Sequence, residues 1–350
     1  MKEEFNIQNF VRENVKGLKP YSSARDEYVS DGSNMVFLDA NENPFENGVN
    51  RYPDPQQRSL KGILAEQKGI SEKQLLLGNG SDEVLDLLFR AFCEPMKDGV
   101  LTFPPTYGMY KVLAGINAIE NREVLLTSDF ELDVDAILKS AGTNTKMLFI
   151  CSPNNPTGNS FDQQAILKLL NDFNGLVIID EAYIDFSEKP SWTSRLSDFP
   201  NLVITQTLSK AYGMAGIRLG ICIASEDVIK VLNRIKPPYN VNALTQRRAV
   251  KRVLNISQIK SEVNAVLEQK RLLLRVLPKI SFIQKVYRSD ANFLLLKVDN
   301  ANERYDQLLK RGVVVRNRSS QPRCKDALRF TIGTPEENIK LVNALQNIEK

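Results

Sequence analysis

Apolar runs of strand length alternate with amphipathic stretches through the middle of the chain. The stretches between the runs place apolar residues at the spacing of a helix face. Strands are therefore expected near 75–77, 100–103, 123–126, 146–150, 176–179, 202–204 and 219–223. Strands that alternate with helices in this way are typical of an α/β fold with a largely parallel sheet covered by helices on both faces.

The two ends of the chain have different patterns. Residues 1–19 space their apolar side chains like an amphipathic helix, and 35–38 is a short apolar run that predicts a strand. A long segment at 244–277 predicts one or two linking helices. Beyond it, a small α+β domain is expected, with strands near 292–297, 313–315 and 327–332 and helices near 301–311 and 335–348.

These patterns suggest four parts. We expect an amino-terminal arm with part of the small domain at 1–45 and a large domain at 46–243. Linking helices at 244–277 and a carboxy-terminal small domain at 278–350 complete the chain.

Composition narrows the classes of function. The 350 residues are 42% apolar and 25% charged, as in ordinary globular proteins. The net charge of +4 is small and its lysines and arginines are scattered, which argues against nucleic acid as a partner. No apolar run reaches about 18 residues, and the amino terminus lacks the core of a signal peptide, so no membrane partner is expected.

Histidine is absent. This excludes mechanisms with an imidazole base and nearly all zinc sites, so no metal is expected and proton transfer must fall to lysine, tyrosine or carboxylate. The sequence contains four cysteines, Cys93, Cys151, Cys222 and Cys324, and none of them forms a C-x-x-C pair. We expect them to be free thiols of a protein in a reducing compartment. We therefore expect a cytoplasmic enzyme.

Lys210 is the main candidate for covalent chemistry. It follows the apolar run 202–204 and a short polar turn that ends on Ser209, and Arg218 comes eight residues later. Most lysines are solvated surface charges. Here the neighbouring glycines permit a close backbone approach, and an arginine can bind a phosphate with two hydrogen bonds. The combination favours a lysine that forms a Schiff base with pyridoxal phosphate.

Asp180 and Asn155 also follow apolar runs. Asp180 comes directly after the run 176–179, where a buried carboxylate needs a cation such as a protonated pyridine nitrogen. An aspartate that caps the following turn is an equally good explanation locally. Asn155 lies in S-P-N-N-P-T-G, whose prolines would hold its amide toward a ring oxygen, although a plain tight turn also explains the prolines.

A phosphate site is predicted where Gly78-Asn79-Gly80-Ser81 opens a helix. The free N–H groups of a helix start can bind an anion, so Gly80, Ser81 and Asp82 are candidates. The charges of Asp82 and Glu83 favour an ordinary helix start instead. Tyr107, in P-P-T-Y, is a candidate to stack on the pyridine ring, unless it is a core or turn residue.

Together these motifs resemble the fold type I aminotransferases of the aspartate aminotransferase superfamily. The resemblance rests on S-P-N-N-P-T-G, D-E-A-Y and T-L-S-K-x(7)-R, in this order. Within that family the chain is similar to the histidinol-phosphate aminotransferases. This narrower similarity rests on P-Y-S-S-A-R at 20–25, A-N-E-N-P at 40–44, R-Y-P at 51–53, A-F-C-E-P at 91–95, P-P-T-Y-G-M-Y at 104–110 and L-R-F-T-I-G-T at 328–334.

The resemblance implies a fold, a reaction and an assembly. The fold would be a mainly parallel seven-stranded sheet with helices on both faces and a small α+β domain. The reaction would be a ping-pong transfer of the amino group of histidinol phosphate to 2-oxoglutarate, giving imidazole-acetol phosphate and glutamate. The protein would be a homodimer with shared active sites.

The resemblance also implies roles for single residues. Lys210 would carry the cofactor and move the proton, Asp180 would face the ring nitrogen, and Asn155 and Tyr183 would hydrogen-bond the ring oxygen. The cofactor phosphate would be held by Gly80, Ser81, Asp82, Ser209, Arg218 and the partner subunit's Tyr52.

The substrate site has its own candidates. Arg316 ends the run V-V-V-R, and Arg329 lies inside L-R-F-T-I, where a buried charge needs an anion. A salt bridge to a protein carboxylate is the alternative. The resemblance implies that both arginines bind the substrate's phosphate and the carboxylate of glutamate, and that Tyr21 reaches the substrate bound by the partner subunit.

Other functions fit parts of the pattern. A broad-specificity aromatic aminotransferase and a threonine-phosphate decarboxylase share the cofactor motifs, whereas P-Y-S-S-A-R and P-P-T-Y-G-M-Y favour the histidinol-phosphate enzyme. A regulatory domain that binds the cofactor would need an added DNA-binding domain, for which we expect no room. A dinucleotide-dependent oxidoreductase is disfavoured because no G-x-G-x-x-G follows the first strand.

Overall fold

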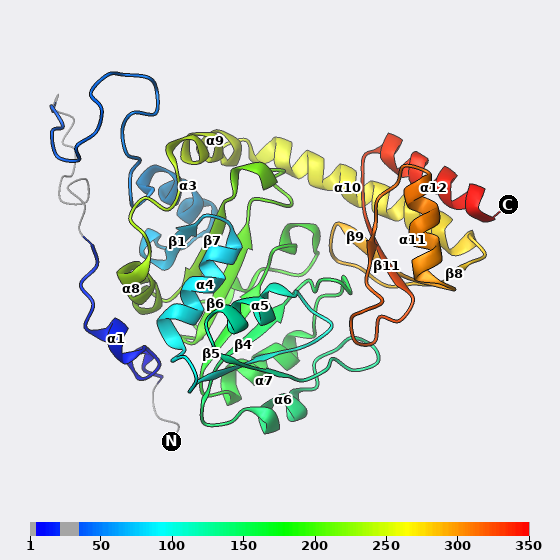
Figure 1. Cartoon of the computed structure of the whole chain (residues 1–350), viewed down its shortest axis with the longest axis horizontal. Coiled ribbons are helices and arrows are strands. Elements are labelled where there is room, and N and C mark those ends of the chain that lie inside the picture. The colour runs from blue at the N-terminus through cyan, green and yellow to red at the C-terminus, as the bar shows by residue number, and fades with distance from the viewer. Residues whose placement is uncertain (1–4, 22–34, 350) are drawn as a thin grey trace. The chain divides into compact units, whose positions relative to one another are not determined.

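The computed structural model describes residues 5–21 and 35–349 (Figure 1). The chain divides into two compact units, each of which is described by itself. Unit 1 comprises Met1–Asp98, Leu113–Glu120 and Trp192–Ile256, and unit 2 comprises Gly99–Val112, Asn121–Ser191 and Ser257–Lys350. The four-part division expected from the sequence stays a prediction.

The main sheet has seven strands in the order β1-β7-β6-β5-β4-β2-β3. The expected seven-stranded α/β sheet is thereby confirmed. Its strands are β1 (Leu75–Gly78), β2 (Gly99–Thr102), β3 (Glu120–Glu123), β4 (Thr145–Cys151), β5 (Leu176–Asp180), β6 (Leu202–Thr207) and β7 (Gly220–Ala224). Strand β4 is parallel to β2 and β5, and β7 is antiparallel to β1 and β6.

Unit 1 packs its helices around β1, β6 and β7 (Figure 1). Its helices are α1 (Glu13–Lys16), α3 (Arg58–Lys68), α4 (Ser81–Phe92), α8 (Glu226–Ile235) and α9 (Ala243–Val253). Helix α4 contacts all three strands, and its buried face includes Leu85, Leu88 and Phe89, as its apolar spacing predicts. This packing holds the amino terminus of α4 next to the start of β7.

Unit 2 contains β2, β4 and β5 together with helices α6 (Val134–Ser140) and α7 (Gln163–Asp172), which contact each other. Helix α5 (Met109–Ile116) begins in this unit. The strands β4 and β5 are buried at every position except Lys146, because side chains on both of their faces are covered. Strand β5 ends on Asp180, whose register partner on β4 is Cys151.

A second, antiparallel sheet lies in the carboxy-terminal part of unit 2, in the order β10-β11-β9-β8 (Figure 1). Its strands are β8 (Ile283–Val286), β9 (Phe293–Val298), β10 (Arg316–Asn317) and β11 (Ala327–Thr331). Helices α10 (Ile256–Val276), α11 (Ala301–Lys310) and α12 (Pro335–Glu349) accompany it. A core that includes Leu294, Leu328 and Phe330 joins the sheet to the helices.

Three local expectations were wrong, and one strand was missed. The strand expected at 123–126 is the polar β3 at 120–123, which suits its place at the edge of the sheet. The run 313–315 precedes β10, because cross-strand pairing starts at Arg316. Residues 35–38 form no strand. Strand β8, which the sequence analysis did not identify, adds an edge to the small sheet.

The amino-terminal helix expected at 1–19 is also interrupted. Its described part forms a 3-10 turn at Ile7–Asn9 and the short helix α1. The amide of Arg12 donates to the carbonyl of Ala91 at 3.0 Å, so it cannot continue a helical ladder from the preceding turn. Residues 1–4 lie outside the described part of the chain. No helix among the described residues has the length and apolar character needed to cross a membrane.

Candidate active site

Lys210 lies just beyond the carboxyl end of β6. The six residues of β6 are buried, and the amide of Leu208 continues the pairing to the carbonyl of Leu219 at 3.1 Å. The next residue, Ser209, is held by Thr207, whose Oγ1 accepts from the Ser209 amide at 3.1 Å. Lys210 follows as an exposed residue. The packed strand and this short turn therefore present the lysine amine outside the core.

Glycines shape the backbone around the start of α4. Gly80 has a φ of +84°, and a Cβ placed on it would lie 2.5 Å from Nη2 of Arg218. A Cβ on Gly220 would lie 2.3 Å from the amide nitrogen of Ser81. The contact at Gly220 is with backbone atoms, which cannot give way, and the positive φ of Gly80 strains any other residue, so both positions favour glycine. The two glycines allow β7, the start of α4 and the Arg218 side chain to lie together.

Arg218 is placed close to the helix start by its backbone. It adopts a left-handed conformation with a φ of +53°, and its Nη2 lies 3.6 Å from Oδ2 of Asp82. No side chain caps α4, whose first residue is Ser81. The structure thus brings Gly80, Ser81, Asp82 and Arg218 together. The acidic charge of Asp82, which seemed unfavourable for an anion site, lies beside a guanidinium.

Asp180 is a buried carboxylate with a neutral donor at each oxygen. It is 4% exposed, and its Oδ2 accepts a hydrogen bond from the hydroxyl of Tyr110 at 2.7 Å. Its Oδ1 accepts from the amide of Ala182 at 3.2 Å, so the turn contact considered as an alternative is also present. The sequence analysis did not single out Tyr110. The only signal was its place in P-P-T-Y-G-M-Y, three residues after Tyr107.

Aromatic rings fix the position of Tyr110. Its ring stacks on Phe149 with centroids 5.0 Å apart, and Tyr107 meets it edge-on at 5.5 Å. Burial, followed by the charge of Asp180, raises the pKa of the Tyr110 phenol well above its usual value. The phenol is therefore a hydrogen-bond donor over the whole physiological pH range. Burial raises the pKa of the neighbouring Cys151 thiol as well.

Asn155 meets Arg329 in unit 2. The nearby Asn154 side chain donates to the carbonyl of Pro105 at 2.9 Å, which ties this loop to the segment before α5. Nη1 of Arg329 donates to Oδ1 of Asn155, a residue that is 8% exposed. The carbonyl oxygen of the Asn155 side chain is thus occupied, and its amide nitrogen is the group that can donate to a ligand.

The same arginine continues into an aromatic stack. The Arg329 guanidinium lies over the ring of Phe293 at 5.0 Å, and Tyr183 meets Phe293 edge-on at 5.1 Å. Burial raises the pKa of the Tyr183 phenol, while the charge of Arg329 opposes that rise. Tyr183 is therefore protonated near neutral pH. The structure brings Asn155, Tyr183 and Arg329 together, as the sequence motifs suggest.

Arg316 and Arg329 are direct cross-strand partners in the pairing of β10 with β11. Among the residues that the structure describes, neither forms an ion pair with a carboxylate. Burial, followed by the charge of Arg316, lowers the pKa of Arg329, although it stays charged at neutral pH. Within the described ranges, the salt bridge considered as an alternative is therefore not found for either arginine. Arg316 is exposed, contrary to the burial expected from the sequence, whereas Arg329 is half-buried.

The two candidate tyrosines near the amino terminus, Tyr21 in the expected arm and Tyr52 at the start of the expected large domain, lie at the surface. Tyr52 is 49% exposed, and its ring stacks on Tyr239 with centroids 4.4 Å apart. Tyr21 is 73% exposed. Residues 22–25 of the P-Y-S-S-A-R motif, which include Arg25, lie outside the described residues. Both tyrosines are accessible to another molecule.

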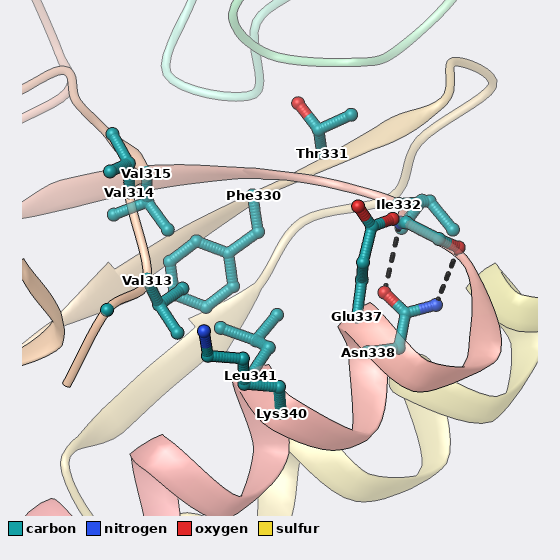
Figure 2. Close-up of a pocket in the computed structure, with 12 residues that line it drawn as sticks. Val313, Val314, Val315, Phe330, Thr331, Ile332, Glu337, Asn338, Lys340 and Leu341 are labelled. Carbon is teal, nitrogen blue, oxygen red and sulfur yellow. Dashed lines mark hydrogen bonds between the residues drawn. The ribbon is translucent and has the colours of Figure 1, made fainter.

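Two cavities differ in their relation to the candidate residues. One of about 370 Å³ in unit 1 is lined in part by Tyr52. The other, of about 400 Å³, lies between the segment 312–315, the end of β11 and the start of α12 (Figure 2). Its buried Asn338 already exchanges hydrogen bonds of 3.0 and 2.9 Å with the backbone of Gly333, drawn as dashed lines in Figure 2. The lining of this second cavity includes none of the candidate residues. In the described part of the chain, no cluster of acidic or cysteine side chains could hold a metal ion.

Comparison with known proteins gives consistent matches. The model of the family "Aminotransferase class I and II" matches residues 35–345. A histidinol-phosphate aminotransferase of Flavobacterium johnsoniae is 63% identical over 343 residues, which cover 98% of this chain and 98% of that protein.

Solved structures agree with these matches. The crystal structure of the histidinol-phosphate aminotransferase from Clostridium acetobutylicum is 25% identical with a TM-score of 0.79, and the match covers 86% of this chain and 91% of that one. A histidinol-phosphate aminotransferase from Sinorhizobium meliloti, in complex with pyridoxal-5'-phosphate, has a TM-score of 0.78 at 20% identity. That match covers 85% of this chain and 83% of the other, and shows a common fold.

Proposed function

Because the chain belongs to the family of class I and class II aminotransferases, we propose that it transfers the amino group of L-histidinol phosphate to 2-oxoglutarate. The products are imidazole-acetol phosphate and glutamate, and the reaction is a step of histidine biosynthesis. The 63% identity to a histidinol-phosphate aminotransferase over nearly the full length supports this substrate. The structural observation that carries it is the pairing of Arg316 with Arg329, two cations without a carboxylate partner in the described chain.

The cofactor is pyridoxal 5'-phosphate. The residues of unit 1 fit the cofactor phosphate. A Cβ at Gly80 would fill the space next to the Arg218 guanidinium, and a Cβ at Gly220 would fill the space next to the amide of Ser81. We assign the phosphate to Gly80, Ser81, Asp82, Ser209 and Arg218. The residues of unit 2 fit its ring, because Asp180 is a buried carboxylate suited to a ring nitrogen that carries a proton.

The other ring contacts follow from the donors that unit 2 offers. Tyr183 and the amide nitrogen of Asn155 would donate to the ring oxygen, and Tyr107 would pack on the ring. Asp180 stabilises the positive charge on the ring nitrogen. The hydrogen bonds from Tyr110 and Ala182 hold that carboxylate in one orientation.

Lys210 has two roles. It would bind the cofactor covalently, and its amine would serve as the base that moves the proton of the substrate carbon. When bound, the cofactor supplies a carbonyl carbon that takes up the amino group and a ring that accepts the electron pair. Lys210 is exposed beyond the end of β6, which suits a lysine that binds a molecule entering the site.

Assembly belongs to the same proposal. The protein is a homodimer in the cytoplasm, and Tyr21 and Tyr52 act in the site of the partner subunit. Exposed large apolar and aromatic side chains between positions 21 and 52 support an interface there: Tyr21, Val36, Leu38, Phe45 and Tyr52. Four buried free cysteines fit a reducing compartment.

A substrate panel with purified holoenzyme tests the proposal. The enzyme is given 2-oxoglutarate together with one of four amines: histidinol phosphate, histidinol, phenylalanine or threonine phosphate. The glutamate and the carbon dioxide that form are measured. Histidinol phosphate should be preferred over histidinol by about a hundredfold or more in kcat/KM, because arginines left without an anion are costly. Equal efficiency on the two amines would indicate an aromatic aminotransferase, and carbon dioxide from threonine phosphate would indicate a decarboxylase.

The covalent role is tested separately. Borohydride reduction of the holoenzyme should place the cofactor on the peptide that contains Lys210, and Lys210→Ala should abolish turnover. A label on another lysine would overturn the assignment of Lys210.

A further inference from the structure

A third arginine lies beside the pair formed by Arg316 and Arg329. The pairing of β10 with β11 continues beyond Asn317, because the amide of Arg318 donates to the carbonyl of Ala327 at 2.8 Å. Side chains alternate between the two faces of a strand, so Arg318 is on the same face as Arg316. Arg329 is directly opposite Arg316 and therefore shares that face. Three guanidinium groups thus lie on one face of the small sheet.

The opposite face of these strands is occupied by other groups. Leu328 and Phe330, the neighbours of Arg329 in β11, belong to the core of the small domain. The side chain of Asn317, between the two arginines of β10, donates to Oδ1 of Asn302 in α11 at 2.7 Å. The helices therefore cover the face that bears Asn317, and the arginines lie on the face turned away from them.

Arg318 is half-buried and has no ion pair or side-chain hydrogen bond among the described residues. Its Nε is buried without an acceptor, and so is the Nε of Arg329. Burial, followed by the charges of Arg329 and Arg316, lowers the pKa of Arg318 to about 10. In the part of the chain that the structure describes, no acidic side chain pairs with Arg316, Arg318 or Arg329 to offset the repulsion among them.

Such an arrangement is unfavourable in the free protein. Like charges directly opposite each other destabilise a strand pair, and a buried donor without an acceptor loses the hydrogen bond it had with water. A bound anion removes both costs, since its oxygens accept from the guanidinium groups and its charge offsets theirs. A phosphate monoester carries nearly two negative charges at neutral pH, whereas a carboxylate carries one.

We propose that Arg318 is a substrate-binding residue that, with Arg316 and Arg329, forms a three-arginine site selective for a phosphate group over a carboxylate. The inference rests on the proposed function and deepens it, because it assigns the discrimination between phosphorylated and unphosphorylated amines to a residue outside the sequence motifs. Arg318 contributes less to the binding of 2-oxoglutarate or glutamate. The carboxylate that either compound places in this site has two oxygens and one charge, fewer than a phosphate monoester has.

Three variants of the holoenzyme test this role. Arg318→Gln removes the charge, and Arg318→Lys keeps it but loses the planar fork. Lys325→Gln is the matched control, since it removes an equal charge from an exposed residue of the same loop. Melting temperatures of all three show whether the fold is intact. Saturating cofactor is kept present so that inorganic phosphate cannot bind at the cofactor-phosphate site.

Two measurements decide the outcome. The first is kcat/KM for histidinol phosphate, histidinol and glutamate, and the second is the inhibition constant of inorganic phosphate against histidinol phosphate. Arg318→Gln should lower kcat/KM for histidinol phosphate and weaken the inhibition about ten- to a hundredfold, the size expected for charge-assisted hydrogen bonds. Histidinol and glutamate should change by less than about threefold. Arg318→Lys should recover part of the loss, and Lys325→Gln should behave like the wild type.

The inference and the proposed function fail in different ways. If the wild type does not prefer histidinol phosphate, the proposed function is wrong, and the inhibition constants still report whether Arg318 binds phosphate. If the wild type shows the preference and Arg318→Gln keeps both it and the phosphate inhibition, the inference is overturned. An equal loss on all substrates in Arg318→Gln and Arg318→Lys would indicate a structural role, which also overturns it.

Discussion

The hydroxyl of Tyr110 lies 2.7 Å from Oδ2 of Asp180, and both side chains are buried. The two residues are 70 positions apart and come from the start of α5 and the end of β5. A hydrogen bond to a charged acceptor such as the Asp180 carboxylate is stronger than a hydrogen bond between two neutral groups. Tyr110 therefore both supports the negative charge of Asp180 and limits the rotation of its carboxylate.

Tyr110→Phe should lower turnover about tenfold while the enzyme keeps its cofactor. The lost hydrogen bond to a charged group is worth about 1.5 kcal/mol or more, and the aromatic packing on Phe149 is retained. Turnover and the bound cofactor, from its visible absorbance, are measured on the same sample. Tyr305→Phe is the control for removing a tyrosine hydroxyl, because Tyr305 is a partly buried residue that packs against the core of the small domain. Unchanged turnover in Tyr110→Phe would show that Ala182 alone suffices to hold Asp180.

Asp180→Asn should reduce activity far more than it reduces cofactor content. The carboxylate stabilises charge on the ring and does not contact the cofactor phosphate, so binding depends on it less than catalysis does. The expected cost is about 2 kcal/mol or more, as for a charge-assisted hydrogen bond. Cofactor content is measured by absorbance after dialysis, and turnover is measured in parallel. Near-normal activity would mean that Asp180 serves only the turn at Ala182.

Subunit mixing should reveal the shared site. Inactive Lys210→Ala is mixed with a Tyr21→Phe, Tyr52→Phe double variant of low activity, and the subunits are allowed to exchange. Each hybrid dimer should contain one site with Lys210 and both tyrosines intact, so activity should exceed the sum of the separate samples. Exchange is verified with differently tagged subunits. Confirmed exchange without a rise in activity would place both tyrosines in the site of their own subunit.

Lys61→Met should stabilise the protein at neutral pH. Lys61 is 6% exposed in α3, and burial, followed by the charge of Lys236, lowers its pKa to about 8. Between pH 8 and the ordinary pKa of 10.5, the Lys61 amine is protonated in the unfolded chain and neutral in the folded protein. The free energy of unfolding therefore rises with pH in this window. Below pH 8 the folded protein bears the full cost of the buried charge.

The gain should be about 2 kcal/mol in the free energy of unfolding at pH 7, measured with urea. In the wild type, stability should increase from pH 8 to pH 10 more steeply than in Lys61→Met. The exposed Lys73→Met is the control, because it removes a charge that the fold does not bury. A loss of stability in Lys61→Met would show that the ammonium is held by favourable contacts.

The sequence alone located six of the seven strands of the main sheet, all but the polar edge strand β3, and the turns that carry the candidate residues. Burial on both faces produces continuous apolar runs, so β5 and β6 could be placed to within a few residues. Proline and glycine restrict the backbone over only a few residues, which is why the loop with Asn155 and the approach at Gly80 were also accessible from the sequence. Each of these features depends on a few consecutive residues, so it can be predicted from the local sequence.

The tertiary structure decided which side chains meet. The bond between Tyr110 and Asp180 and that between Arg329 and Asn155 join residues 70 and 174 positions apart, and no local pattern encodes either contact. Strand register placed Arg318 beside Arg316 and Arg329, and a shift by one residue would have turned it to the opposite face. The valine run before Arg316 predicted a strand three residues too early, because pairing depends on β11 as much as on the run itself. Burial and turn preference are properties of a segment, whereas register and side-chain contacts belong to pairs of segments, so only the folded chain determines them.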